Sequence, residues 1–141
     1  MYCMKTVSEK MGIRAQMRAV FVDAPDEVMN ELGLPRLDLQ LSVRGSFDYI
    51  HLFVRSQAAF NRRFPVCARH LKPSGVLWVS WLKGGIKHSD LNQHIVIRLG
   101  YDFGMVESKG ISLSRDWSAL KFTHPKPGKV YNNSYGKDPV Q

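Results

Sequence analysis

The pattern of apolar and polar positions along the chain predicts strands alternating with helices. An almost unbroken apolar run at residues 75–81 follows the turn Lys72-Pro73-Ser74-Gly75 and is typical of a strand buried on both faces. Residues 37–43 instead alternate between apolar and polar side chains, which indicates a strand near a sheet edge. The predicted strands are residues 17–23, 37–43, 47–54, 75–81, 105–113 and 117–123. A short link joins the last two, which allows an antiparallel pair.

Helix signals lie between these strands. Pro25 suits the first turn of a helix that Gly33 would end. A longer helix is predicted from Ser56 to about Lys72, and Pro65 should kink it or start a second segment. Its apolar face is formed by Phe60, Phe64, Cys67 and Leu71.

Ser89 is predicted to be the N-cap of the next helix, which Gly104 would end. One apolar face of this helix carries Leu91, Ile95 and Leu99. The elements together predict an α/β fold of three layers, with a mostly parallel, twisted sheet of about six strands and an antiparallel closing strand. We expect the strands in the spatial order second, first, third, fourth, sixth, fifth, with Leu77 and Val79 nearly inaccessible.

Length and composition favour a single intracellular domain. The 141 residues suffice for one core, which we place in residues 1–124, followed by an irregular tail at residues 125–141. Cys3 and Cys67 stand far apart and fit no metal site, so reduced thiols in the cytoplasm are expected. We find no apolar run long enough to span a bilayer and no signal peptide.

The net charge of +8 is concentrated toward the ends of the chain. Residues 1–18 contribute +3 and residues 125–141 contribute +2, which leaves +3 for the remainder. A cluster without an intervening acidic residue is formed by Arg55, Arg62, Arg63, Arg69 and Lys72. Such a cluster is either a solvated helix face or a surface for nucleic acid or an acidic partner.

Several segments resemble known families. The turn and strand at residues 71–81 and the closing strand pair resemble the later half of class I methyltransferases that use S-adenosylmethionine. A closer resemblance is to a bacterial family catalogued as domain of unknown function number three thousand and fifty-two, whose members look like shortened relatives of that fold. It covers residues 9 to about 123 and is carried by Lys10-Met-Gly-Ile-Arg14, Met17-Arg18, Ala24-Pro25, residues 47–56, residues 71–81 with Lys83, Ser89-Asp-Leu91 and residues 116–122. The chain departs from the family at Leu82, where proline is usual, and in the tail.

The resemblance implies a degenerate methyltransferase-like (Rossmann-like) fold and no established activity. A class I methyltransferase has a glycine-rich turn after its first strand, since glycine lets the backbone approach the cofactor. The corresponding turn here is acidic and lacks glycine: Val22-Asp23-Ala24-Pro25-Asp26-Glu27. We find no acidic residue after a clear second strand to hold a ribose, although Asp38 and Asp48 are nearby in sequence. We therefore expect no S-adenosylmethionine and predict no other cofactor.

Ligands of open α/β sheets bind beyond the carboxyl ends of the strands, which defines a candidate site. The residues expected there are Asp23, Ser80, Trp81, Lys83, Ser89 and Asp90. An aromatic face, a cation and helix amides could hold a small anion or a nucleotide. The alternative is structural: Trp78 and Trp81 would both be core residues and Ser89 a simple cap. His51 lies mid-strand, where a hydrogen-bonded core histidine is commoner than a base.

Three functional hypotheses follow from the sequence. The first is a binding or interaction domain that has lost the cofactor turn. The second is a small enzyme, or a small-anion or nucleotide binder, with Lys83 holding an anion and Asp23 or Asp90 as base. The third is a protein that binds nucleic acid or an acidic partner through the basic cluster or through the basic ends of the chain. A homodimer through the edge of the last strand pair is compatible with each.

Overall fold

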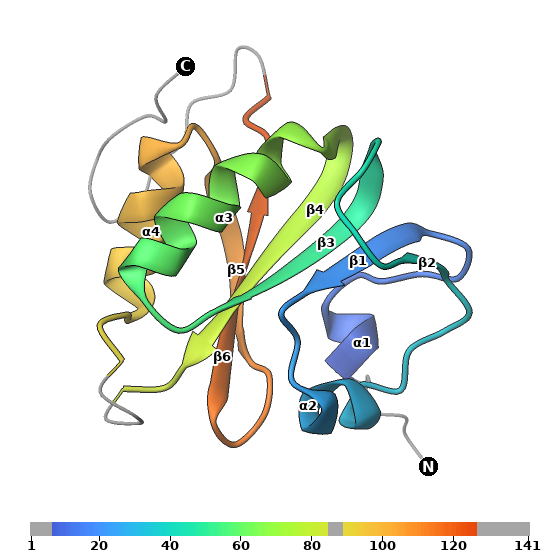
Figure 1. Cartoon of the computed structure of the whole chain (residues 1–141), viewed down its shortest axis with the longest axis horizontal. Coiled ribbons are helices and arrows are strands. Elements are labelled where there is room, and N and C mark those ends of the chain that lie inside the picture. The colour runs from blue at the N-terminus through green and yellow to red at the C-terminus, as the bar shows by residue number, and fades with distance from the viewer. Residues whose placement is uncertain (1–6, 85–88, 127–141) are drawn as a thin grey trace.

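The computed structural model describes residues 7–84 and 89–126, which form one sheet with helices on both faces (Figure 1). The helices are α1 (Val7–Lys10), α2 (Asp26–Glu31), α3 (Gln57–Arg69) and α4 (Gln93–Asp102). The strands are β1 (Arg18–Val22), β2 (Asp38–Gln40), β3 (Phe47–Val54), β4 (Leu71–Leu82), β5 (Val106–Ser112) and β6 (Trp117–Thr123). No helix within the described residues is long and apolar enough to cross a membrane.

The sheet has the order β2-β1-β3-β4-β6-β5. β1 is parallel to β2 and β3, and β3 is parallel to β4. β6 runs antiparallel to both β4 and β5. The helix α3 supplies the long connection that the parallel pair β3 and β4 requires. The predicted fold class and the predicted spatial order of the strands are both confirmed.

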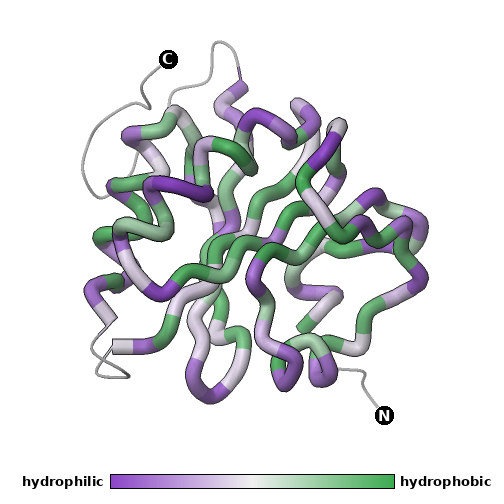
Figure 2. The backbone as a smooth tube through the Cα atoms, in the orientation of Figure 1, coloured by the Kyte–Doolittle hydropathy of each residue, from purple (hydrophilic) through white to green (hydrophobic). Residues whose placement is uncertain are grey.

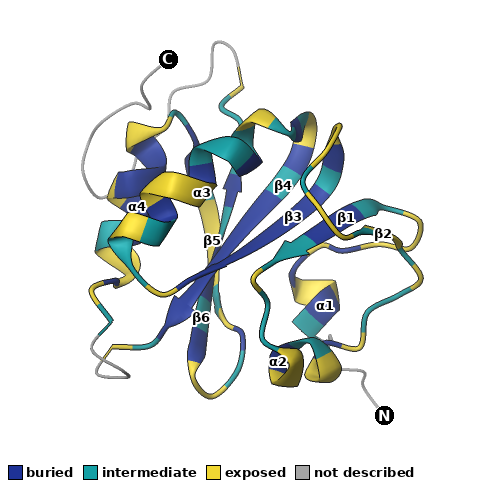
Figure 3. Cartoon of the chain, viewed as in Figure 1, coloured by how far each residue is buried: buried dark blue, intermediate teal, exposed yellow. Residues whose placement is uncertain are grey.

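Two apolar clusters fill the two faces of the sheet. α3 and α4 cover one face, where Phe64 and Val96 join the same cluster as Leu77. The segment at α1 and the helix α2 cover the other, with Met11 in the same cluster as Trp78. Apolar residues run along the central strands in Figure 2, and the same strands are the buried ones in Figure 3.

The second half of β4 is deeply buried, as the sequence predicts. Leu77 and Val79 are both 0% exposed. Trp78 and Trp81 belong to different clusters, so their side chains lie on opposite faces of β4, and both are buried. The structure thus shows the alternative to the ligand site, in which both tryptophans are core residues.

The start of β4 differs from the prediction. Residues 72–75 do not form a turn before the strand but a bulge within it, because the register passes from Phe47↔Leu71 to Tyr49↔Val76. Pro73 has no N–H to donate to the neighbouring strand. A Cβ on Gly75 would lie 2.9 Å from the carbonyl oxygen of Phe47, so only glycine lets the two strands come this close.

Other boundaries are shorter or displaced. β2, at one edge of the sheet, contains three residues rather than the seven predicted. α3 is one helix that continues through Pro65, so no second segment starts there. α4 begins after Asn92, not after Ser89, because the Asn92 side chain accepts the hydrogen bond from Ile95 N at 2.9 Å. Residues 127–141 of the predicted tail lie outside the described residues.

Candidate functional site

The turn after β1 adopts an unusual backbone conformation. Asp23 has a φ of +58°, in the left-handed region that glycine occupies most readily. Its carboxylate lies 3.6 Å from Nη2 of Arg63 on α3, and both side chains are about half exposed. The chain thus forms a tight turn with an acidic residue where the related fold has glycine.

The N-terminus of α3 is satisfied by groups of the protein itself. Ser56 accepts a hydrogen bond from Ala59 N at 3.1 Å. Asp90 accepts from Gln57 N through its carboxylate and from Gln57 Nε2 through its carbonyl, each at 2.9 Å. Because these bonds occupy free amides of the first turn, little capacity is left there for an external anion.

The groups around the end of β4 are also engaged. Lys83 Nζ donates to Ser112 Oγ at 2.7 Å, and Lys83 N donates to the carbonyl of Asp116 at 2.8 Å. Ser89 Oγ accepts from Leu91 N at 3.3 Å, which is a local turn contact and not a helix cap. Trp81 is 3% exposed, so its ring offers almost no face to a ligand.

Ser80 belongs to a buried chain of hydrogen bonds that crosses β3 and β4. His51 Nε2 lies 2.6 Å from Ser80 Oγ, and His51 Nδ1 lies 2.9 Å from Tyr49 Oη. The Tyr49 hydroxyl also lies 3.3 Å from Met11 Sδ, and the tautomer of His51 decides which group donates in its bonds to Tyr49 and Ser80. Within the described residues, no buried side-chain polar atom lacks a partner.

Burial sets the protonation states of His51 and Tyr49 in this chain of hydrogen bonds. Desolvation lowers the pKa of His51 from 6.5 to about 3 and raises the pKa of Tyr49 well above 10. The imidazole is stacked against the rings of Phe21 and Phe53. A serine beside a histidine is the arrangement of an activated nucleophile, but both side chains are 0% exposed and no substrate can reach them. The prediction that His51 is a hydrogen-bonded core residue is confirmed.

Sequence reasoning named Ser80 and His51 separately and missed their contact. The contact between Tyr49 and His51 could have been predicted, because the two residues are two apart on one strand and therefore share a face. The pairing of His51 with Ser80 depends on the register between β3 and β4, which places Trp78 opposite His51. That register follows from the bulge at the start of β4, which the sequence pattern did not indicate.

Cavities open on both sides of Asp23. One, of about 340 Å³, lies between β1, the β2–β3 loop and α3, and its lining includes Val22, Val43, Val66 and Cys67. A second, of about 230 Å³, is lined by Phe53, Val54, Arg55, Ala59 and Trp117 as well as Asp23. Trp81 lines a different cavity near Gln93, so the structure does not bring the six candidate residues together around one opening.

The five residues of the predicted basic surface spread along α3 and its ends. The Arg55 guanidinium lies 5.2 Å from the centre of the Trp117 ring, where cation–π attraction holds it. Arg63 pairs with Asp23, and Lys72 pairs with Asp48 at 3.0 Å. Arg62 and Arg69 are exposed and form no ion pair with any described residue. Because α3 runs back across the sheet, these five cations do not form one patch.

Comparison with known proteins identifies the fold. The sequence matches no family model and no curated protein. The structure is similar to ribosomal protein L11 methylase from Lactobacillus delbrueckii subsp. bulgaricus, with a TM-score of 0.55 and 14% identity over 85% of this chain and 75% of that one. A glycopeptide N-methyltransferase, MtfA, solved with S-adenosylmethionine, gives a TM-score of 0.55 at 9% identity over 85% and 86% of the two chains. An S-adenosylmethionine-dependent methyltransferase from Clostridium acetobutylicum gives 0.53 at 10% identity over 84% and 88%. The chain therefore has the fold of class I S-adenosylmethionine-dependent methyltransferases.

Proposed function

We propose that this chain is a non-catalytic binding domain built on the methyltransferase fold, and a member of the shortened bacterial family that its sequence resembles. The observation that carries the proposal is the turn after β1. Asp23 takes the left-handed conformation there, and its carboxylate is paired with Arg63. Asp26 and Glu27 follow in the first turn of α2, so an anionic carboxylate of a cofactor would meet repulsion there.

The other groups of the candidate site support the same conclusion. Ser80 and Trp81 are buried, Lys83 is held by Ser112, and Asp90 caps α3. Four of the six candidate side chains are thus already part of the folded framework.

Binding of S-adenosylmethionine tests this proposal directly. A ligand at 100 times its dissociation constant raises the free energy of unfolding by about 2.7 kcal/mol. For a domain of this size that corresponds to an increase in Tm of about 8 °C. We expect no such increase with S-adenosylmethionine or S-adenosylhomocysteine at about 1 mM, and an increase with either would show that the cofactor site is retained.

A second candidate is a small-molecule site in the cavity between β1 and α3. Its walls are formed by Val22, Val43 and Val66, and the Arg63–Asp23 pair also lines it, so a small, mainly apolar molecule fits it. We expect 8-anilinonaphthalene sulfonate to bind and Val66→Trp to abolish its fluorescence. Ala58→Trp, at an exposed position of the same helix, is the matched control. An equal loss of dye fluorescence in Val66→Trp and Ala58→Trp would count against a ligand site in this cavity.

A further inference from the structure

The edge of the sheet opposite the candidate site is strongly basic. Strands β1, β2, β3 and β4 are parallel, so their first residues meet at one edge, which we call the amino-end edge. Arg18 is level with Asp38 in the register of β1 and β2, and Phe47 is level with Leu71 in that of β3 and β4. The cations at or just before these strand starts are Arg14, Arg18, Arg36, Arg44, Arg69 and Lys72.

Hydrogen bonds hold these segments side by side. Gln16 N donates to the carbonyl of Arg36 at 2.7 Å, which joins the segment before β1 to the segment before β2. Nη2 of Arg18 donates to the carbonyl of Arg44 at 2.5 Å, and Gly45, at a φ of +77°, leaves room for that guanidinium. These hydrogen bonds hold the segments that carry Arg14, Arg36 and Arg44 next to the start of β1.

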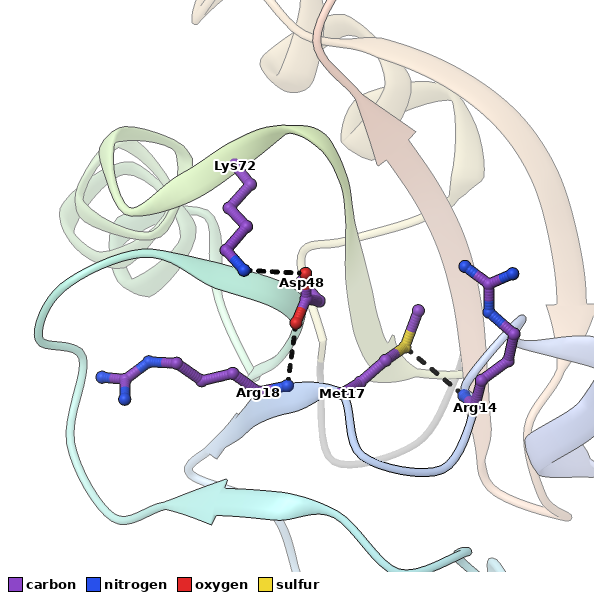
Figure 4. Close-up of polar contacts among 5 residues, drawn as sticks. All are labelled: Arg14, Met17, Arg18, Asp48 and Lys72. Carbon is purple, nitrogen blue, oxygen red and sulfur yellow. Dashed lines mark hydrogen bonds and ion pairs between the residues drawn. The ribbon is translucent and has the colours of Figure 1, made fainter.

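Few carboxylates neutralise this charge. Asp48 accepts from Lys72 Nζ at 3.0 Å and from Arg18 N at 2.9 Å, and these bonds lower its pKa (Figure 4). The Arg18 guanidinium lies 4.7 Å from the centre of the Phe47 ring and forms no ion pair with a described residue. Figure 4 shows that it points away from Asp48.

Three further arginines are exposed at this edge. Arg14, Arg36 and Arg44 are all solvent-accessible, and none of them pairs within 4.0 Å with a carboxylate of the described chain. Asp38, the other carboxylate of the edge, accepts from the side chain of Gln40 at 2.8 Å. Five of the six cations, all but Lys72, thus have no carboxylate partner among the described residues.

The carboxyl-end edge carries little net charge. The segments after the strands contain Asp23, Asp26, Glu27, Asp90 and Asp116 together with Arg55, Lys83 and Arg115, and Arg63 pairs with Asp23 there. The charge of the domain is therefore polarised along the strand direction, with the positive end away from the position where this fold binds ligands.

We propose that the amino-end edge binds the sugar–phosphate backbone of a nucleic-acid duplex. Four strands about 4.8 Å apart span roughly 14 Å, a length over which a duplex presents about eight phosphates. Arginine is suited to phosphate because its planar guanidinium can donate two parallel hydrogen bonds. The exposed large apolar side chains of the described chain are Leu39, Leu41 and Phe103, and all lie outside the residues that define this edge. The edge therefore lacks the aromatic platform of a single-strand binder and the apolar centre of a protein interface.

The test compares two triple variants of the full chain that remove the same charge. R14A/R36A/R44A removes three unpaired cations of the amino-end edge and keeps the backbone carbonyls that join the segments. R62A/R98A/R115A removes three exposed arginines from α3, α4 and the β5–β6 turn. Fluorescence anisotropy with DNA and RNA duplexes of about 20 base pairs, across a salt series, gives the affinity and its salt dependence. Unchanged Tm values establish that both variants are folded.

We expect the unmodified chain to bind at least one duplex at about 50 mM salt, with a slope of log K against log salt of about −4 to −5 for five phosphate contacts. The edge variant should lose most of this affinity and flatten the slope by about 2 to 3, whereas the control variant should change both far less. Equal losses in the two variants, or no binding to either duplex, would overturn the proposal. Binding of polyglutamate without either duplex would also overturn it and would assign the edge to an acidic protein.

Discussion

Acidification should destabilise this protein through His51. The side chain is fully buried, and its pKa is about 3 in the folded state, against 6.5 when solvated. Because the folded-state pKa is lowered, the unfolded chain binds more protons between these values, so stability is complete above pH 6.5 and falls as the pH drops toward 3. The loss is about 2 kcal/mol at pH 5 and about 5 kcal/mol below pH 3.

Urea unfolding followed by tryptophan fluorescence at pH 8, 6 and 5 measures this loss. His51→Gln is the matched variant, because its amide can still bond Ser80 but does not titrate. We expect the variant to be less stable at pH 8, by about 1–3 kcal/mol, and to show a flatter pH dependence between 6.5 and 5. Asp48, whose pKa is lowered from 3.8, contributes only at lower pH. If the wild-type chain and the variant lost the same stability between pH 8 and pH 5, the assignment of the loss to His51 would be wrong.

Three further predictions concern packing, charge and thiol reactivity. Gly100→Ala should cost about 1–3 kcal/mol in urea unfolding, because a Cβ would lie 2.1 Å from the Phe122 ring; Gly84→Ala, with nothing within 4 Å, should change stability little. Asp48→Asn should cost about 1 kcal/mol at pH 7, and a cost that persisted unchanged at pH 3 would contradict the role given to its charge. In a Cys3→Ser background, Cys67 should react with an aromatic disulfide reagent only on unfolding, since burial raises its pKa to about 12; rapid reaction of the native protein would contradict this.

The sequence pattern predicted the architecture because the strongest signals were in the strands that are buried on both faces. β3 and β4 are apolar runs without a strict alternation, and both lie at the centre of the sheet. Boundaries were less accurate where tertiary contacts decide them. The bulge at Gly75 exists because the backbone of β3 lies against it, and α4 starts at Asn92, although Ser89 is an equally good cap by residue type.

The candidate site was less predictable than the fold for a physical reason. Topology places Asp23, Ser80 and Lys83 near the carboxyl ends of the strands, but it does not say whether a side chain points into solvent or into the protein. Ser80 lies on the face of β4 that meets His51, so it is buried, while Lys83 reaches across to β5. Only the register between strands and the packing of the opposite helices decide such orientations.

The two ends of the sheet differ in how completely the protein satisfies its own polar groups. At the carboxyl end, Ser56, Asp90 and Asn92 occupy amides at the starts of α3 and α4. A ligand would have to displace these intramolecular bonds, each of which contributes about 1 kcal/mol, before it gained any of its own. At the amino end, Arg36 and Arg44 hold the fold through backbone groups, and their side chains are exposed without a carboxylate partner among the described residues. Neutralising them with phosphates displaces no bond of the folded chain and releases counterions from the nucleic acid, so the amino end is where binding requires the least rearrangement.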